Sequence, residues 1–373
     1  MANLHLELSG IPLRHPIMSA SGPPVRNGAQ ALATAAGGAS ALVTKTISVT
    51  PARLCAPFLA QVGGGLLNAE TWSDISKEQW LRKELPMIQS AGLPVIIQLG
   101  YTAPQLHELV PMFRDYAQMF ELSTHYTGNS LLPILSALET AKKLSDVPVY
   151  VKLSPCTDIQ NIALALERAG ADGLVLCNSF GPCLGIDVES ARPVLGSDGA
   201  YGWLSGSALH AISLRCVYEA AKVVKIPIVG VGGITNGREA AAMLMAGASA
   251  VQVCTQAVLE GPSAFGRIAE ELNAFMDRKG YRRVSDICGL ALGKSGANRW
   301  QPGYLEQSAD GCVRCHTCVH CCRYGAISIE EGKWSIDKLL CSRCGLCVSR
   351  CPQEVLCMSE LPTGGKDYAE KHT

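Results

Sequence analysis

Eight cysteines in the C-terminal part of the chain follow the spacing C-x2-C-x2-C-x3-C twice. Each member of the second copy follows its counterpart in the first at one constant displacement. The eight positions are Cys312, Cys315, Cys318, Cys322, Cys341, Cys344, Cys347 and Cys351. In iron–sulfur proteins with this pattern, three closely spaced thiolates bind one 4Fe–4S cluster, and the fourth, distant cysteine binds the other. The spacing therefore predicts two 4Fe–4S clusters, which carry electrons one at a time.

The same rule predicts how the cysteines are shared between the clusters. One cluster is expected on Cys312, Cys315, Cys318 and Cys351. The other is expected on Cys341, Cys344, Cys347 and Cys322. A pair of zinc knuckles is the alternative, because C-x2-C also binds tetrahedral zinc, but zinc needs paired cysteines rather than three in a row plus one. Cys321 could compete as a ligand and Arg323 replaces the usual proline, although the repeat favours Cys322.

Two clusters in series need a two-electron redox centre, which the preceding residues have to supply. Short β-branched runs alternate there with stretches of helical spacing such as 207–224 and 238–246. Eight strands are expected, at 16–20, 41–45, 95–99, 119–123, 149–153, 173–178, 228–232 and 250–255. This alternation predicts an α/β fold, a parallel (β/α)8 TIM barrel with its active site at the C-terminal strand ends. We expect the catalytic barrel in residues 1–300 and a small α+β domain of bacterial-ferredoxin type, with the C-terminal tail, in residues 301–373.

Composition restricts the class of function. The chain has 373 residues, 48% of them hydrophobic, and a formal net charge of zero. Zero net charge without clustered Lys and Arg argues against a nucleic-acid partner. We see no secretory signal and no apolar run long enough to span a bilayer, so we expect a cytoplasmic protein without membrane partners, in which clustered cysteines serve redox or metal chemistry.

Polar residues stand where several expected strands end. Strand seven ends in Gly232 and Gly233, and such glycine-rich turns expose backbone N–H groups that bind phosphate in this fold. Lys45 and Lys152 end strands two and five, where a buried ammonium is costly unless it meets an anion or a polar ring. Solvent-facing lysines are the alternative interpretation.

In their order along the chain, these motifs resemble those of the dihydroorotate dehydrogenase and dihydropyrimidine dehydrogenase family. The motifs are Ala20-Ser21-Gly22, Lys45-Thr46, Asn68-x-Glu70, Lys152-Leu-Ser-Pro155, Asn178-Ser179, Leu204-Ser205-Gly206, Gly232-Gly233 and Thr255. The resemblance covers essentially the whole chain. It is greatest to the bacterial NAD-dependent dihydropyrimidine dehydrogenase catalytic subunit, which also ends in a two-cluster ferredoxin module.

The resemblance implies FMN at the barrel mouth. The implied FMN residues are Ala20, Ser21, Gly22, Lys45, Thr46, Lys152, Asn178, Gly206, Gly232, Gly233, Cys254 and Thr255. Lys45 and Lys152 would reach the polar edge of the flavin, and the later glycines with Thr255 would hold the phosphate. A planar cyclic amide would be bound over the ring by Asn68, Glu70, Asn178 and Ser179.

The sequence departs from the family in the loop after strand four. The family has Asn-Leu-Ser-Cys-Pro, whose Cys is the acid/base, whereas this chain has Glu121-Leu-Ser-Thr124-His125-Tyr126. With Thr124 aligned to the Cys and Glu121 to the Asn, threonine cannot exchange a proton alone at neutral pH. His125 is the first candidate for the acid/base and Tyr126 the second, while either residue could instead only pack. Glu121 could be a protonated hydrogen-bond donor or the partner of Lys152.

The sequence therefore predicts a flavin enzyme that interconverts a C=C and a CH–CH bond in a carbonyl-bearing ring. Because of the changed loop, neither uracil nor dihydroorotate is expected to be the best substrate. Ferredoxin or an NAD(P)H-oxidising flavoprotein subunit is the expected electron partner, since no G-x-G-x-x-G unit follows a strand. The resemblance also allows a homodimer. The alternatives are an electron-transfer subunit with an inactive barrel, a true dihydropyrimidine or dihydroorotate dehydrogenase, and a non-redox barrel with structural clusters.

Overall fold

The computed structural model describes residues 2–125, 128, 130–294, 302–307 and 311–360. The chain divides into two compact units, Met1–Gly293 and Lys294–Thr373. Within the described residues, no helix combines the length and the apolar character that a membrane span requires.

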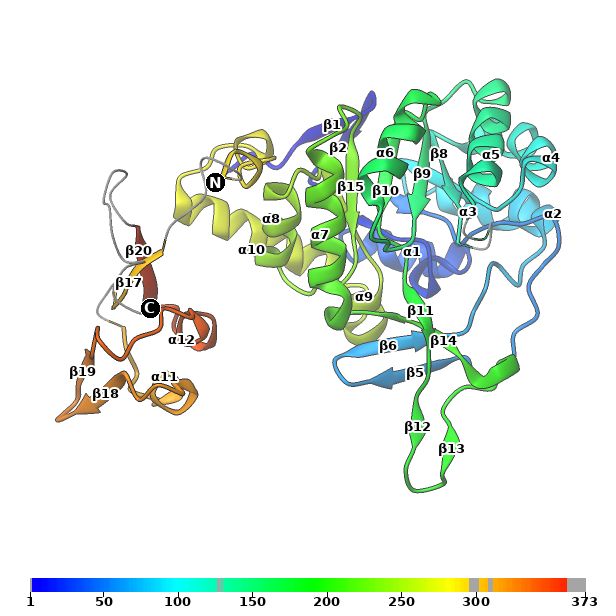
Figure 1. Ribbon diagram of the computed structural model, residues 1–373. Coiled ribbons are helices and arrows are strands. Elements are labelled where there is room, and N and C mark those ends of the chain that lie inside the picture. Colours follow the sequence, from blue (N-terminus) through cyan, green and yellow to red (C-terminus); the bar gives the residue numbers. More distant parts are fainter. Residues whose placement is uncertain (1, 126–127, 129, 295–301, 308–310, 361–373) are drawn as a thin grey trace. The chain divides into compact units, whose positions relative to one another are not determined.

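Eight parallel strands form the central sheet of the first unit (Figure 1). In sheet order they are β3 (Ile17–Ser19), β16 (Ala250–Val253), β15 (Ile228–Val231), β10 (Gly173–Leu176), β9 (Val149–Leu153), β8 (Met119–Ser123), β7 (Val95–Leu99) and β4 (Leu42–Val43). The Ser19 N–H donates to the Ala41 carbonyl at 3.1 Å, so the two end strands meet and the barrel closes. Each strand lies inside its predicted range, and the predicted TIM barrel is confirmed.

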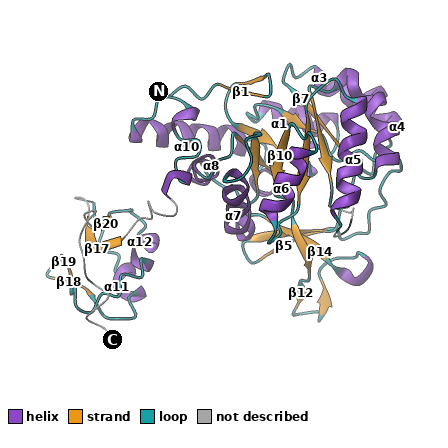
Figure 2. Cartoon of the chain, turned by 45° about the horizontal axis from the view of Figure 1, so that its top comes forward, coloured by secondary structure: helices purple, strands orange, loops and turns teal. Residues whose placement is uncertain are grey.

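Helices follow the strands and surround the barrel (Figure 2). They are α1 (Gly28–Ala36), α2 (Lys77–Gln79), α3 (Leu85–Gln89), α4 (Ala103–Phe113), α5 (Leu131–Leu144), α6 (Ile159–Arg168), α7 (His210–Ala221), α8 (Gly237–Met245), α9 (Thr255–Glu260) and α10 (Ala264–Lys279). Short 3-10 or π turns lie at η1 (Pro23–Val25), η2 (Trp80–Glu84), η3 (Arg114–Tyr116), η4 (Asp198–Ala200), η5 (Ser207–Leu209), η6 (Val284–Asp286) and η7 (Leu292–Lys294). The N-caps of α1 and α8 are Asn27 and Asn236, whose side-chain oxygens accept backbone N–H groups of the first turn.

Alternation along the strands separates two hydrophobic cores. On β8, Phe120 and Leu122 point outward to the helices, while Met119 belongs to the core inside the barrel. Tyr150 on β9 points inward too, and its ring lies where a side chain on Gly173 would be, 2.3 Å from the position of a Cβ atom. The hairpin of β1 (Leu6–Leu8) and β2 (Ile11–Leu13) contributes to this inner core and covers one end of the barrel.

A second sheet brings further side chains to the mouth. It consists of four antiparallel strands, in the order β11 (Phe180–Cys183), β14 (Gly202–Ser205), β6 (Gly65–Asn68) and β5 (Leu59–Val62). A small ribbon, β12 (Ile186–Asp187) with β13 (Arg192–Pro193), extends beyond it (Figure 1). Trp203 of β14 pairs with Asn68 of β6, which places two segments far apart in sequence beside the same cavity.

The second unit contains two copies of one arrangement. Its elements are β17 (Pro302–Gln307), α11 (Thr317–Cys321), β18 (Ile327–Glu330), β19 (Lys333–Ile336), α12 (Leu346–Arg350) and β20 (Leu356–Glu360). Helix α12 follows α11, and strand β20 follows β18, at the same displacement that separates the two copies of the cysteine repeat.

Candidate active site and cysteine cavities

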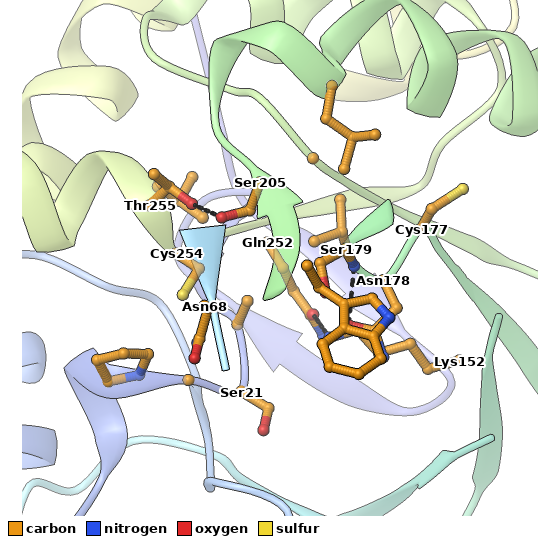
Figure 3. Close-up of a pocket in the computed structure, with 18 of the residues that line it drawn as sticks. Ser21, Asn68, Lys152, Cys177, Asn178, Ser179, Ser205, Gln252, Cys254 and Thr255 are labelled. Carbon is orange, nitrogen blue, oxygen red and sulfur yellow. Dashed lines mark hydrogen bonds between the residues drawn. The ribbon is translucent and has the colours of Figure 1, made fainter. Parts of the chain in front are cut away.

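One cavity at the C-terminal strand ends of the barrel gathers all the residues that the sequence assigned to flavin or to substrate (Figure 3). They are Ala20, Ser21, Gly22, Lys45, Thr46, Asn68, Glu70, Lys152, Asn178, Ser179, Gly206, Gly232, Gly233, Cys254 and Thr255. They come from six barrel strands and from the second sheet. The chain therefore brings into one space side chains from almost the whole length of the barrel unit, with Ala20 and Thr255 as the extremes.

Glycines at one end of the cavity leave room for a ligand to approach the protein backbone. Gly206, Gly232 and Gly233 have φ of +89°, +119° and +69°, a region that favours glycine. A Cβ atom on Gly232 would lie 2.2 Å from Ser213 Oγ, and one on Gly233 would lie 2.7 Å from the His210 nitrogen. Beside them the Thr255 hydroxyl donates to Ser205 Oγ at 2.8 Å. Backbone N–H and hydroxyl donors of this kind fit a phosphate.

A polar layer crosses the barrel interior below this cavity. Lys152 Nζ lies 3.1 Å from Glu121 Oε1, and the two side chains are 4% and 1% exposed. Gln252 donates to the other oxygen of Glu121 at 2.6 Å, and Gln98 donates to Glu121 Oε1. Glu121 therefore accepts hydrogen bonds from two amides and forms an ion pair with Lys152, which together satisfy its buried carboxylate. The pairing with Lys152, one of the two interpretations of Glu121, is the arrangement in the structure.

Lys45 forms a second buried pair in the wall of the cavity. Its ammonium donates to Glu70 Oε2 at 2.7 Å, with 5% and 2% of the side chains exposed. The Glu70 backbone N–H donates to Asn68 Oδ1 at 2.6 Å, which holds both residues in one turn. Two lysines at strand ends thus face the cavity, each paired with a buried carboxylate. Positive groups in this position suit the polar edge of a flavin. Both lysines are buried, so the interpretation of solvent-facing lysines is wrong.

The loop after β8 differs from the expectation drawn from the motif. Side chains alternate along the strand, so Ser123 and His125 line the cavity, whereas Glu121 points inward one layer deeper. Thr124 points elsewhere and donates to the Lys152 carbonyl at 2.6 Å. The alignment of Glu121 with the family's Asn and of Thr124 with its Cys therefore needs correction, because neither side chain lines the cavity and Ser123 does. Tyr126 lies outside the described residues.

His125 is held against an aromatic wall. Its ring contacts Trp203 edge-on, with centroids 4.9 Å apart, and its Nδ1 lies 3.0 Å from Ser154 Oγ. Burial, and secondarily the charge of Lys152, lowers the pKa of His125 to about 4. The imidazole is therefore neutral at pH 7. Burial likewise raises the pKa of the Cys254 thiol to about 11, so this residue faces the cavity uncharged.

The lining residues that sequence reasoning missed include Gln98, Ser123, Trp203 and Gln252. Gln98 and Gln252 are single polar residues at inward positions of apolar strands, VIIQL and AVQV, and that pattern could have identified them. Trp203 belongs to a strand outside the barrel, and no local pattern marks it.

The second unit has two cavities, each lined by one set of four cysteines. One is lined by Cys312, Cys315, Cys318 and Cys351, and the other by Cys322, Cys341, Cys344 and Cys347. Each cavity thus takes three closely spaced cysteines from one copy and the last cysteine from the other. Cys321 also lines the second cavity.

The backbone between the cysteines repeats as well. Arg314 and His316 have φ of +56° and +59°, and their counterparts in the second copy, Arg343 and Gly345, have +59° and +75°. Successive turns of this kind can form concave sites lined by backbone N–H groups. Among the described residues, no three His, Cys, Asp or Glu side chains could hold one metal ion. Sulfurs spread around a cavity suit a four-iron cube better than a single zinc ion.

The comparisons with known proteins concern the barrel unit and identify its family. The family model described as dihydroorotate dehydrogenase matches residues 3–276. The chain is 35% identical over 301 residues to the "Dihydroorotate dehydrogenase B (NAD(+)), catalytic subunit" of Methanothermobacter thermautotrophicus, covering 77% of this chain and 98% of the relative. The protein of the same name from Pyrococcus abyssi is 33% identical over 304 residues, 78% of this chain and 99% of the relative. A "Putative dihydroorotate dehydrogenase A (fumarate)" of Solibacter usitatus is 33% identical over 296 residues, 76% and 96% respectively. The matched segment of the family model ends before the first of the eight cysteines.

Proposed function

The chain belongs to the dihydroorotate dehydrogenase family, and on that premise we propose that it interconverts a C=C and a CH–CH bond in a carbonyl-bearing cyclic small molecule, with two 4Fe–4S clusters that exchange the electrons with an external partner. Membership of the family makes it a flavin-dependent oxidoreductase acting on CH–CH bonds. The observation that carries the proposal is the single cavity in which Lys152, the glycine turns, Asn68 and Asn178 meet.

FMN, the cofactor expected for the family, would supply hydride exchange with the substrate and single-electron exchange with the clusters. The residues present fit it. Gly206, Gly232 and Gly233 would receive the phosphate, and Lys152 would place positive charge at the polar edge of the ring. Glu121, whose Oε1 lies 3.1 Å from the Lys152 ammonium, would fix the position of that charge.

Substrate recognition falls to side chains from different elements. Asn178 follows β10 and Asn68 ends β6, and Ser179 and Trp203 line the same cavity. Amide groups can read the alternating donors and acceptors of a cyclic amide, and a buried site of this kind rejects rings that leave its polar atoms unpaired. Glu70 is committed to Lys45, so it supports the wall rather than offering a free carboxylate.

Proton exchange with the substrate carbon is proposed to involve His125 or Tyr126. In the family motif, the acid/base is the third residue after the first Asn. Ser123 lines the cavity, so we align it with the first Asn of the family motif. The third residue after Ser123 is Tyr126, and this alignment favours Tyr126 as the acid/base. The neutral imidazole of His125 can accept a proton, but its low pKa makes it a weak base at pH 7.

The substrate is proposed to be neither uracil nor dihydroorotate. Ser123 offers a short hydroxyl at the place at the mouth, instead of an amide that reads both edges of an imide, and lost complementarity of this kind costs specificity heavily. Anaerobic mixing with dihydroorotate, dihydrouracil and a panel of other cyclic amides tests this proposal. Rapid bleaching of the flavin by either named compound would contradict the substrate assignment. Tyr126→Phe is expected to slow bleaching by the true substrate at least ~100-fold, whereas an unchanged rate would remove Tyr126 from the mechanism.

An electron-transfer subunit with an inactive barrel is the second candidate function. It is favoured by the absence of the family Cys from the described loop and opposed by the retained pair Asn68 and Asn178, which a relay does not need. Bleaching by any cyclic substrate excludes it. The partner is proposed to be ferredoxin or an NAD(P)H-oxidising flavoprotein, because two relatives are named catalytic subunits of NAD(+) enzymes. A true dihydropyrimidine dehydrogenase, the bacterial enzyme that the sequence resembles, is the remaining alternative and would be established by turnover of uracil.

A further inference from the structure

Trp334 contains a buried hydrogen-bond donor that the fold leaves without a partner. Within the described residues, Trp334 Nε1 and Ser213 Oγ are the buried side-chain polar atoms that make no hydrogen bond. Leaving an N–H group buried and unpaired costs about 1–3 kcal/mol, and native proteins do this rarely and usually for a reason. Trp334 lies on β19 opposite Ile329 of β18, so the position of its ring is fixed by a strand pair rather than by a loop.

The indole borders a cysteine cavity. Trp334 lines the space that Cys312, Cys315, Cys318 and Cys351 also line. Its ring packs in the small core of the second unit, which includes the buried Cys318. The indole and the Cys318 side chain thus belong to the same packed core and border the same cavity. The unpaired indole N–H group of Trp334 therefore borders a cavity that is lined by cysteine sulfurs.

We propose, on the basis of the function proposed above, that Trp334 donates an N–H hydrogen bond to the Cys318 sulfur of the cluster in this cavity and so raises that cluster's reduction potential. Reduction adds one negative charge to the cluster. A donor aimed at a ligand sulfur stabilises the reduced form more than the oxidised form, and hydrogen bonds to the sulfurs are an established influence on cluster potentials. Trp334 is a positioning residue for electron transfer and touches no substrate.

The effect belongs to one cluster. Among the described residues, no tryptophan lines the cavity of Cys322, Cys341, Cys344 and Cys347. The indole thus breaks the near-symmetry of the duplicated unit and makes the two clusters unequal. Unequal potentials give the relay a preferred site for the resting electron.

Trp334→Phe in the full-length protein, prepared without air, tests the proposal. Phenylalanine keeps an aromatic ring in the core and removes the N–H. In a potentiometric titration followed by electron paramagnetic resonance, the electron affinity of one cluster is expected to fall about tenfold, which is ~59 mV for a one-electron couple. The second cluster should keep its potential. Trp72→Phe is the control, because its indole donates to the Thr50 carbonyl in the barrel unit and should affect neither cluster.

A second measurement needs no variant. Wild-type protein labelled with 15N-tryptophan should show a magnetic coupling between one reduced cluster and an indole nitrogen. Unchanged or raised potentials in Trp334→Phe, or the absence of this coupling, would overturn the proposal while both clusters remain in place. A wild-type protein that carries no iron after air-free preparation or reconstitution would instead contradict the proposed function itself.

Discussion

At the residue scale, the most constrained group is the carboxylate of Glu121. It lies inside the barrel among apolar layers, where Gln98 and Gln252 donate hydrogen bonds to it and Lys152 forms an ion pair with it. Taking an ion pair out of water is costly, so such a pair persists where it is fully bonded and where its geometry serves a purpose. Here the purpose we infer is to hold the Lys152 ammonium directly below the cavity.

Glu121→Gln should therefore destabilise the barrel. The amide cannot neutralise Lys152, and its own N–H group would meet the donors of Gln98 and Gln252. We expect the free energy of unfolding of the barrel to fall by roughly 3 kcal/mol, measured by denaturant titration. Glu139→Gln is the matched control, because it removes an exposed i,i+4 pair with Lys143 and should change stability immeasurably. Equal effects of the two variants would refute the buried role.

Two histidines predict how stability depends on pH. Burial lowers the pKa of His15 and of His125 from 6.5 to about 4. Between these values the unfolded chain binds more protons than the folded chain, so the stabilising contribution is complete above pH 6.5 and is lost as pH falls toward 4. Each histidine contributes up to ~3 kcal/mol. Replacing either with Gln should flatten the pH dependence of barrel unfolding, while only His125→Gln should also alter flavin reduction by substrate.

At the element scale, the proposed phosphate cradle consists of the turns at Gly206 after β14 and at Gly232 and Gly233 after β15. It depends on backbone conformation rather than on side chains. Gly232 and Gly233 follow β15 in conformations that an L side chain rarely adopts, and Gly206 follows β14 in the same way. The backbone at Gly232 and Gly233 approaches Ser213 and His210 of α7 so closely that a methyl group would displace them. The elements thus hold open a space for an anion.

Gly233→Ala should lose flavin. Its Cβ would lie 2.6 Å from the His210 Cβ atom, and the turn would have to shift away from the phosphate site. We expect FMN content after purification, measured by extraction and fluorescence, to fall at least ~10-fold. Gly261→Ala is the control, with a comparably unfavourable φ of +102° and nothing within 4 Å of the added methyl. If Gly261→Ala loses flavin to the same extent, general strain rather than the cradle is responsible.

At the scale of the whole molecule, the chain combines a hydride-exchanging cavity with two cysteine cavities in a separate unit. The matched family segment covers the barrel, and the eight cysteines lie beyond it. A barrel that only passed hydride between two organic substrates would have no use for this addition. The combination therefore suits an enzyme whose second electron partner is another protein.

Replacement of one cysteine should separate flavin reduction by the substrate from electron exchange with the external partner. Air-free wild-type protein should contain about eight iron atoms, and Cys318→Ala should retain about four. In that variant a substrate should still bleach the flavin, while electron exchange with an external one-electron carrier should fall at least ~10-fold. Cys321→Ala is the control, since it removes the neighbouring thiol that lies outside the repeat, and it should keep all the iron. Loss of iron in Cys321→Ala instead would reassign the ligand now attributed to Cys322.

The sequence by itself determined the elements and the repeat. Strict alternation of apolar runs with helical stretches located all eight barrel strands, because buried parallel strands are short continuous apolar runs between glycines and polar turns. The cysteine spacing, read by the rule that three close cysteines of one copy act with the last cysteine of the other, predicted which four cysteines would line each cavity.

Only the tertiary structure decided which way the side chains face. The change of face at each step along β8 put Ser123 at the mouth and Glu121 one layer lower, a distinction that motif comparison could not make. Trp203, Gln98 and Gln252 joined the site because strand pairing brought distant segments together. Trp334 is a buried donor that makes no hydrogen bond among the described residues. Burial and pairing are properties of the packed chain, and spacing along the sequence does not contain them.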